Sequence, residues 1–121
     1  MTDTAVHYAS EGAAFVATTP GTTVVTVDSG ATLIGGQCSV VNVTTGVVKV
    51  SVFHIPSGGS FSGNNNCLVR EREVMPYGDT RGGVVFLPEL LGQVFEEGDA
   101  LVLVSDTGSA LKYSVNGVVV T

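Results

Sequence analysis

Residues 47–55 read Val-Val-Lys-Val-Ser-Val-Phe-His-Ile, and they give the clearest indication of how this chain folds. Successive side chains of a β-strand point to opposite faces, so a strand here has one apolar face and one mixed face. The apolar face holds Val48, Val50 and Val52, and the mixed face holds Lys49, Ser51, Phe53 and Ile55. Because two large apolar side chains continue the mixed face, we expect that face to be only partly exposed to water.

Strand signals of this kind recur along the chain at short, regular spacing. The sequence contains 23 Val, 13 Thr and 16 Gly but only two Lys and no Trp. Val and Thr favour a half-buried pleated surface, and Gly supplies turns. We predict strands at residues 22–27, 32–43 with a kink at the two glycines, 47–55, 67–74, 84–87, 100–105, 110–115 and 118–121.

Two shorter signals complete this pattern. Residues 88–92 predict one helical turn with Pro88 near its start, and Asn116-Gly117 predicts a two-residue hairpin turn between the last two strands. About eight or nine short strands with frequent turns predict an all-β fold, namely an antiparallel β-sandwich or jelly-roll-like domain.

The first twenty residues differ in character from the rest of the chain. They are mostly small or polar, and Thr19-Pro20-Gly21 ends them as a turn. A chain of 121 residues fits a single domain, so we divide it into an N-terminal arm, 1–20, and a β-sandwich, 21–121. The segment is either an extended arm or a loosely attached first strand, and removal of an arm is expected to leave the sandwich folded. Its apolar anchors are Val6, Tyr8, Phe15 and Val16.

The charge distribution disfavours two classes of partner. Five basic and 11 acidic residues give a net charge of -6, and residues 1–48 contain no Lys or Arg. No basic stripe is therefore available there to neutralise phosphates, so we expect no binding to nucleic acid or to an anionic membrane. No apolar stretch approaches the ~20 residues of a transmembrane helix, and the first residues lack the features of a signal peptide.

One predicted strand is strongly charged. Within residues 67–74, Arg70, Glu71, Arg72 and Glu73 follow one another directly. A strand of this composition is expected at a sheet edge or on a solvent-facing side, where charged side chains also discourage pairing with other chains.

The cysteines and histidines give little sign of chemistry. We expect Cys38 and Cys67 to be free thiols of a reducing compartment, although a disulfide is possible if their strands are neighbours. A zinc site needs about four ligands, and two Cys and two His at these spacings do not resemble one. Cys67 and His54 could form a nucleophile–base pair, but no orienting residue or oxyanion motif accompanies them, and His7 lies far away in the sequence.

Two polar loops and two aromatic residues suggest weaker alternatives. Residues 96–99, Glu-Glu-Gly-Asp, and the asparagines at 64–66 offer oxygen ligands for calcium. We favour a turn with a side-chain-to-backbone hydrogen bond for the first and a loop tip for the second. Phe61 and Tyr77 lie in loops and could belong to a contact surface, whereas sugar-binding modules normally display clustered aromatic platforms.

From residue 22 onward the strands and turns follow a characteristic order. Its signatures are the Thr-Val run after Pro20-Gly21, Ser-Val-Val-Asn-Val-Thr-Thr-Gly at 39–46, Val-Lys-Val-Ser-Val at 48–52 before a Ser-Gly-Gly loop, Val-Met-Pro-Tyr-Gly-Asp-Thr at 74–80, and Phe-Glu-Glu-Gly-Asp-Ala-Leu at 95–101. This series of turn signatures covers about 100 of the 121 residues and resembles a group of small β-sandwich proteins from tailed bacteriophages.

The resemblance implies a virion structural protein, most similar to capsid decoration (cement) proteins. Such a protein binds the major capsid protein and stabilises the shell, commonly as a homotrimer with an N-terminal arm on the capsid. It is made in the host cytoplasm, resides on the virion surface, needs no cofactor and is not an enzyme. Contacts through the arm would then come from Val6, Tyr8, Phe15 and Val16.

Three alternatives remain open at the level of sequence. The first is an adaptor of the tail, baseplate or fibre with the same fold. The second is a carbohydrate- or receptor-binding module, which would need a stacking surface near Phe61 and Tyr77. The third, and the least supported, is a small hydrolase or metal-dependent enzyme.

Overall fold

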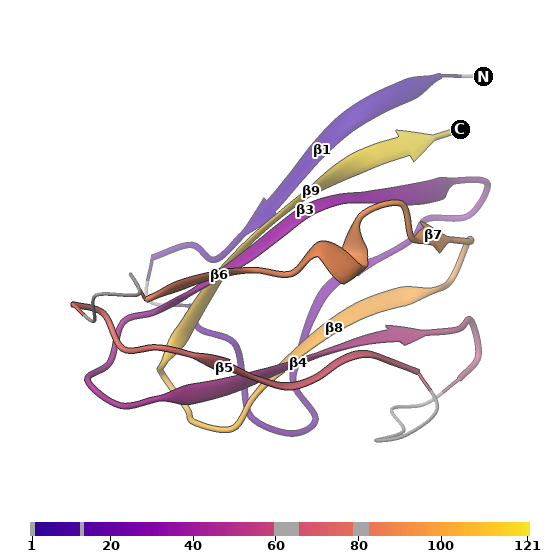
Figure 1. Cartoon of the computed structure of the whole chain (residues 1–121). Helices are drawn as coiled ribbons and strands as arrows, with labels where there is room; N and C mark the ends of the chain where they lie inside the picture. Colours follow the sequence, from indigo (N-terminus) through magenta and orange to yellow (C-terminus); the bar gives the residue numbers. More distant parts are fainter. Residues whose placement is uncertain (1, 13, 60–65, 79–82) are drawn as a thin grey trace.

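The computed structural model describes residues 2–12, 14–59, 66–78 and 83–121, which form two antiparallel sheets packed face to face (Figure 1). Sheet A contains, in spatial order, β1 (Asp3–Ala9), β9 (Leu111–Val120), β3 (Thr32–Asn42) and β6 (Val84–Phe86), with β7 (Val94–Phe95) also pairing with β3. Sheet B contains β2 (Thr22–Thr26), β8 (Ala100–Ser105), β4 (Val48–Ile55) and β5 (Cys67–Val74). A short 3-10 helix, η1 (Pro88–Leu90), links β6 to β7. The predicted all-β sandwich is thus confirmed.

The central strand β4 has the two faces that its sequence predicts. Its three alternate valines, Val48, Val50 and Val52, are at most 1% exposed and belong to the main core between the sheets. On the outer side of sheet B, Phe53 and Ile55 are also buried, in a second apolar cluster with Val102. The mixed face is therefore largely shielded from water, as expected.

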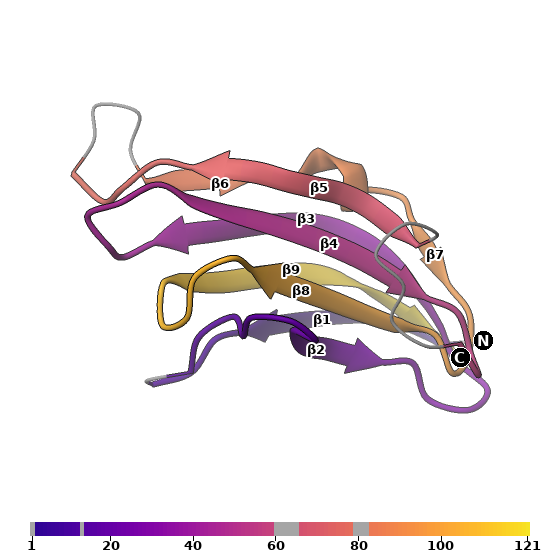
Figure 2. The same cartoon turned by 90° about the horizontal axis from the view of Figure 1, so that it is seen from below.

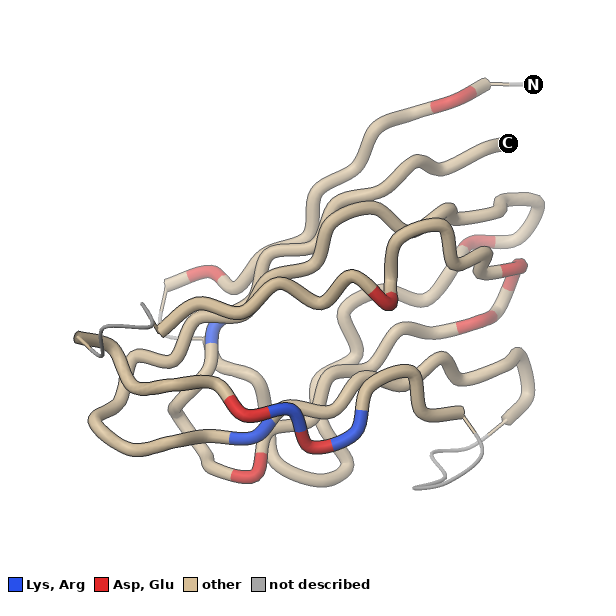
Figure 3. Tube along the Cα trace, in the orientation of Figure 1, with Lys and Arg blue, Asp and Glu red and all other residues tan. Residues whose placement is uncertain are grey.

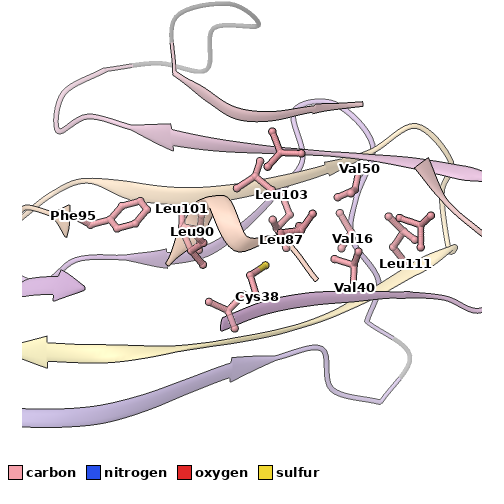
Figure 4. Packing of buried hydrophobic residues seen from close by; sticks show 14 of the residues in the cluster. Val16, Cys38, Val40, Val50, Leu87, Leu90, Phe95, Leu101, Leu103 and Leu111 are labelled. Atoms are coloured by element: carbon pink, nitrogen blue, oxygen red, sulfur yellow. The ribbon is translucent and has the colours of Figure 1, made fainter. Parts of the chain in front are cut away.

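Leucine and aromatic side chains from both sheets and from η1 fill the space between the layers (Figure 4). Burial of one such side chain stabilises the fold by about 1.5–3 kcal/mol, so this layer is the principal source of stability. The largest buried side chains are Phe95, Leu87, Leu90, Leu101, Leu103 and Leu111.

The Asn116-Gly117 pair is not a hairpin turn, because β9 runs through it without interruption. The predicted kink in β3 explains why. The register of β3 against β9 shifts between Gly35 and Cys38, and Asn116 Oδ1 accepts a hydrogen bond of 2.8 Å from the N–H of Gln37 within this bulge. At Gly117, a Cβ atom would lie 2.6 Å from a backbone oxygen of β3. Both residues therefore serve the β3–β9 pairing rather than a chain reversal.

The N-terminal segment differs from the expected arm, because residues 3–9 form β1 and pair along their whole length with β9. After β1 the chain crosses to sheet B, and Val16 is fully buried in the main core. Phe15 is half-buried beneath the Lys112 ammonium, which lies 5.0 Å from the ring centroid. The segment is therefore the first strand of the sandwich, the other interpretation that its sequence allows, and its removal would expose the edge of β9 and take Val16 from the core.

The two lateral sides of the sandwich are built differently (Figure 2). On one side β1 lies over β2, and on the other β5 lies near β6 and η1. The second side is closed by a bidentate ion pair, in which the Arg72 guanidinium of β5 binds the Glu89 carboxylate of η1. The Arg72 hydrogen bond lowers the pKa of Glu89, which keeps this carboxylate ionised. As predicted, the charged strand β5 lies at a sheet edge.

A substitution at Val16 tests how much the N-terminal segment contributes to the stability of the fold. Val16→Ala removes apolar volume from the fully buried core, so we expect the free energy of unfolding to fall by about 2–3 kcal/mol. Urea unfolding followed by circular dichroism measures this change. The nearby exposed Thr18→Ala is the control and should change stability by less than about 0.5 kcal/mol. Equal effects of the two substitutions would contradict the integrated position of this segment.

Candidate interaction surface

Exposed apolar side chains gather on the outer side of sheet A. Among the described residues, nine large apolar side chains are exposed, and six of them lie on this side or at its β6–η1–β7 border. Strand register aligns three of them, because Ile34 of β3 pairs with Val94 of β7 and with Val118 of β9. We call the following set the apolar face: Ile34, Val84, Phe86, Leu91, Val94 and Val118.

The apolar face arises from the alternation of β6 and from the short connection that follows it. Val85 packs against the core and Leu87 is buried within it, so Val84 and Phe86 must point outward. Phe86 is 66% exposed and Leu91 is 67% exposed. Clusters of exposed side chains of this size are unusual on a protein surface. Such clusters mark binding sites for other macromolecules.

A depression of about 170 Å³ lies between Phe86 and Leu91 and is lined by both of these side chains. Its lining also includes Gly36 and Pro88, and none of the described residues that line it is charged. Small-molecule sites usually enclose ~300–1,000 Å³, so this depression is too small for most such ligands. Its size and apolar lining suit a single apolar side chain of a protein partner.

Charged side chains are concentrated elsewhere in the molecule (Figure 3). Most of them lie along β5, on neighbouring β4 and in several loops, whereas Glu89 of η1, Lys112 of β9 and Asp3 of β1 belong to sheet A or its border. The six members of the apolar face are uncharged, and the Glu89 carboxylate at its border is paired with Arg72, so covering the face removes no unpaired ion from water. The apolar face can therefore be covered by a partner with little electrostatic penalty.

The residues expected to contact a partner through an arm occupy different environments. Val6 and Tyr8 of β1 are half-buried and pack against the main core. Burial raises the pKa of Tyr8, and the nearby Asp28 raises it further, so the phenol stays protonated at neutral pH. Phe15 is half-buried and Val16 is fully buried. The structure does not bring these four residues together with the apolar face.

The disfavoured Cys67–His54 pair is not formed: both residues line one shallow hollow, but the Cys67 thiol donates to the Val69 carbonyl and His54 bonds to Asp99. Cys67 packs with the outer apolar cluster around Phe53. The His54 ring instead points inward, with its centroid 4.1 Å from that of Phe95 in the main core. His54 Nε2 donates a 2.9 Å hydrogen bond to the Asp99 carboxylate.

Asp99 organises the turn that precedes β8. Its carboxylate accepts hydrogen bonds from His54, from the Ser57 N–H at 2.8 Å and from the Glu96 N–H at 3.0 Å. The side-chain-to-backbone turn predicted at residues 96–99 is thus confirmed. Burial alone would raise the pKa of Asp99, but the hydrogen bonds outweigh it and hold this pKa below its usual value.

The cysteines are free thiols, as predicted. Cys38 is buried on the inner side of sheet A, and burial raises the pKa of its thiol to about 12. Among the described residues, no group of three His, Cys, Asp or Glu side chains is placed to hold a metal ion. His7 bonds to Ser114 Oγ at 2.7 Å on the outer side of sheet A.

Of the two loop aromatics, only Tyr77 belongs to the described part of the chain. Phe61 and the asparagines at 64 and 65 lie outside the described residues. Tyr77 is 73% exposed and follows β5, whereas Asn66 immediately precedes that strand. Tyr77 is therefore at the far end of β5 from the nearest described neighbour of the asparagine loop.

A comparison with models of protein families, with curated proteins and with solved structures finds no match to this chain. No helix in the described part of the chain is long and apolar enough to span a membrane.

The Asp99 network predicts a pH-dependent contribution to stability. Because the pKa of Asp99 is lowered in the folded state, its contribution is present above the unfolded pKa of about 3.9 and is lost at lower pH. Asp99→Asn should reduce the free energy of unfolding by about 1–3 kcal/mol at neutral pH. Urea unfolding should show this difference shrinking as the pH falls below about 4. The exposed Glu73→Gln is the control; a pH-independent loss in Asp99→Asn would contradict the ionised network.

Proposed function

We propose that this chain is a non-enzymatic binding protein that uses the apolar face of sheet A to join a larger protein assembly. The observation that carries the proposal is the cluster of exposed apolar side chains around Phe86 and Leu91, next to an uncharged depression. A rigid sheet presents these side chains in a fixed arrangement, so little conformational entropy is lost on binding.

The assembly that the sequence resemblance suggests is the capsid shell of a tailed bacteriophage. In this role the protein is a decoration protein that resides on the virion surface, contacts the major capsid protein and acts as a homo-oligomer. Many copies on one shell make even modest contacts effective, because linked contacts reinforce one another. A compact sandwich with one apolar face meets these requirements.

An adaptor of the tail or baseplate would use the same face, so the experiment must separate the two locations. We would incubate the purified protein with empty shells assembled from the major capsid protein of the same phage and, separately, with purified tails. Co-sedimentation with shells supports decoration. Co-sedimentation with tails alone replaces it by the adaptor function, and sedimentation with neither rejects both.

Substitutions on the apolar face should weaken this binding without unfolding the protein. Phe86→Ser combined with Leu91→Ser removes the two most exposed members of the face, and we expect shell affinity to fall about 10- to 100-fold. The matched control is Val43→Ser with Val47→Ser, which changes two exposed valines near the β3–β4 turn. Unchanged affinity of the first variant, or equal losses in both, would show that binding uses another surface.

A further inference from the structure

The four strand edges of the sandwich differ in how well they resist pairing with another chain. An edge strand exposes backbone N–H and C=O groups, and charges, bulges or shortness usually protect it. Strand β5 is protected by the charged run at residues 70–73, and β6 by its length of only three residues. Strand β2 has five residues and is interrupted by a bulge between Thr23 and Val25. Strand β1 has seven residues in unbroken register and contains no Pro, Lys, Arg or Glu. It is the least protected of the four.

The hydrogen bonds that flank β1 show which of its backbone groups face outward. Thr2 and Thr121 exchange two backbone hydrogen bonds, of 3.0 and 2.9 Å, and the Ser10 N–H donates to the Tyr113 carbonyl at 3.0 Å. Antiparallel pairs alternate between bonded and non-bonded positions, so even-numbered residues of β1 bond toward β9. The outward N–H and C=O groups belong to Asp3, Ala5, His7 and Ala9.

We propose that the outer edge of β1 pairs antiparallel with the same edge of a second copy, about a twofold axis at Val6. In this register Asp3 lies opposite Ala9 of the second copy, and Ala5 lies opposite His7 of the second copy. All four outward N–H groups of each strand then find a carbonyl acceptor. Sheet A becomes continuous across the two molecules.

The side chains of β1 are compatible with this register. Val6 of each copy meets Val6 of the other in a non-hydrogen-bonded pair, where side chains approach most closely. Val6 is already half-buried against the core, so the pairing extends an apolar layer. Asp3 of each copy is diagonal to His7 of the other, and the two Asp3 carboxylates stay far apart. Two copies of β1 can therefore pair in this register without placing like charges opposite each other.

The low charge of the surface around β1 also favours pairing with a second copy. The chain has a net charge of -6, so two copies repel each other least where their contacting surfaces carry little charge. On the lateral side formed by β1 and β2, Asp3 is the only Asp, Glu, Lys or Arg in either strand. A twofold contact closes at two molecules. We therefore expect a dimer rather than the trimer implied by the sequence resemblance, and this pairing does not depend on the capsid proposal.

Disulfide trapping tests the register directly. Val6→Cys in a Cys67→Ser background places two thiols at the axis, where oxidation should give a covalent dimer on a non-reducing gel. The matched control is Thr4→Cys, since Thr4 and Thr4 of the second copy lie about 13 Å apart along the strands in this register. That separation is beyond the reach of a disulfide. Trapping of the control or of Ala5→Cys in place of Val6→Cys would overturn the proposed register.

A second experiment removes one outward donor and leaves β1–β9 pairing intact. Ala5→Pro deletes an N–H that points away from β9, and proline is tolerated at such edge positions. Light scattering should give about twice 12.4 kDa for the wild type and for the control Ala5→Ser, but 12.4 kDa for Ala5→Pro. The dilution series begins near ~0.5 mM, where even a dimer of micromolar affinity is populated. A monomeric or threefold wild-type mass, or a dimeric Ala5→Pro, would overturn the proposal.

Discussion

The long pairing of β3 with β9, interrupted by one bulge, determines the rest of this molecule. Before the bulge the odd-numbered Leu33 points into the core, and after it the even-numbered Cys38 and Val40 do so. A strand with unbroken alternation would turn one of these halves outward. The hydrogen bond from the Gln37 N–H to Asn116 fixes the bulge. Both the buried layer and the outward position of Ile34 follow from this local shift.

The same arrangement separates two kinds of surface. Sheet B and the loops carry most of the charged side chains, and these keep that side of the molecule hydrated (Figure 3). The outer side of sheet A carries the apolar face, whose members come from four separate parts of the chain. The fold thus places most of its charged side chains and its largest exposed apolar side chains, Phe86 and Leu91, on different parts of the surface.

Much of the fold could be predicted from sequence, because β4, β5 and β8 each contain a complete local signal and their observed bounds agree with it to within one residue. Asn116-Gly117 misled the prediction because the local preference for a turn was overridden by pairing with β3. The burial of Val16 could not be predicted from the local sequence, because it depends on where the chain crosses from β1 to sheet B. The apolar face could not be predicted either, because β6 is apolar on both sides and only its pairing shows that Phe86 faces outward.

The buried thiol of Cys38 has a consequence for observing this protein in motion. It lies beside the depression between Phe86 and Leu91, yet it is only 1% exposed and its pKa is about 12. A thiol in this state reacts with an alkylating reagent only when the local structure opens. The rate at which Cys38 is alkylated therefore measures how often β6 and η1 separate from β3. The molecule carries its own reporter of native-state opening at the surface where a partner would sit.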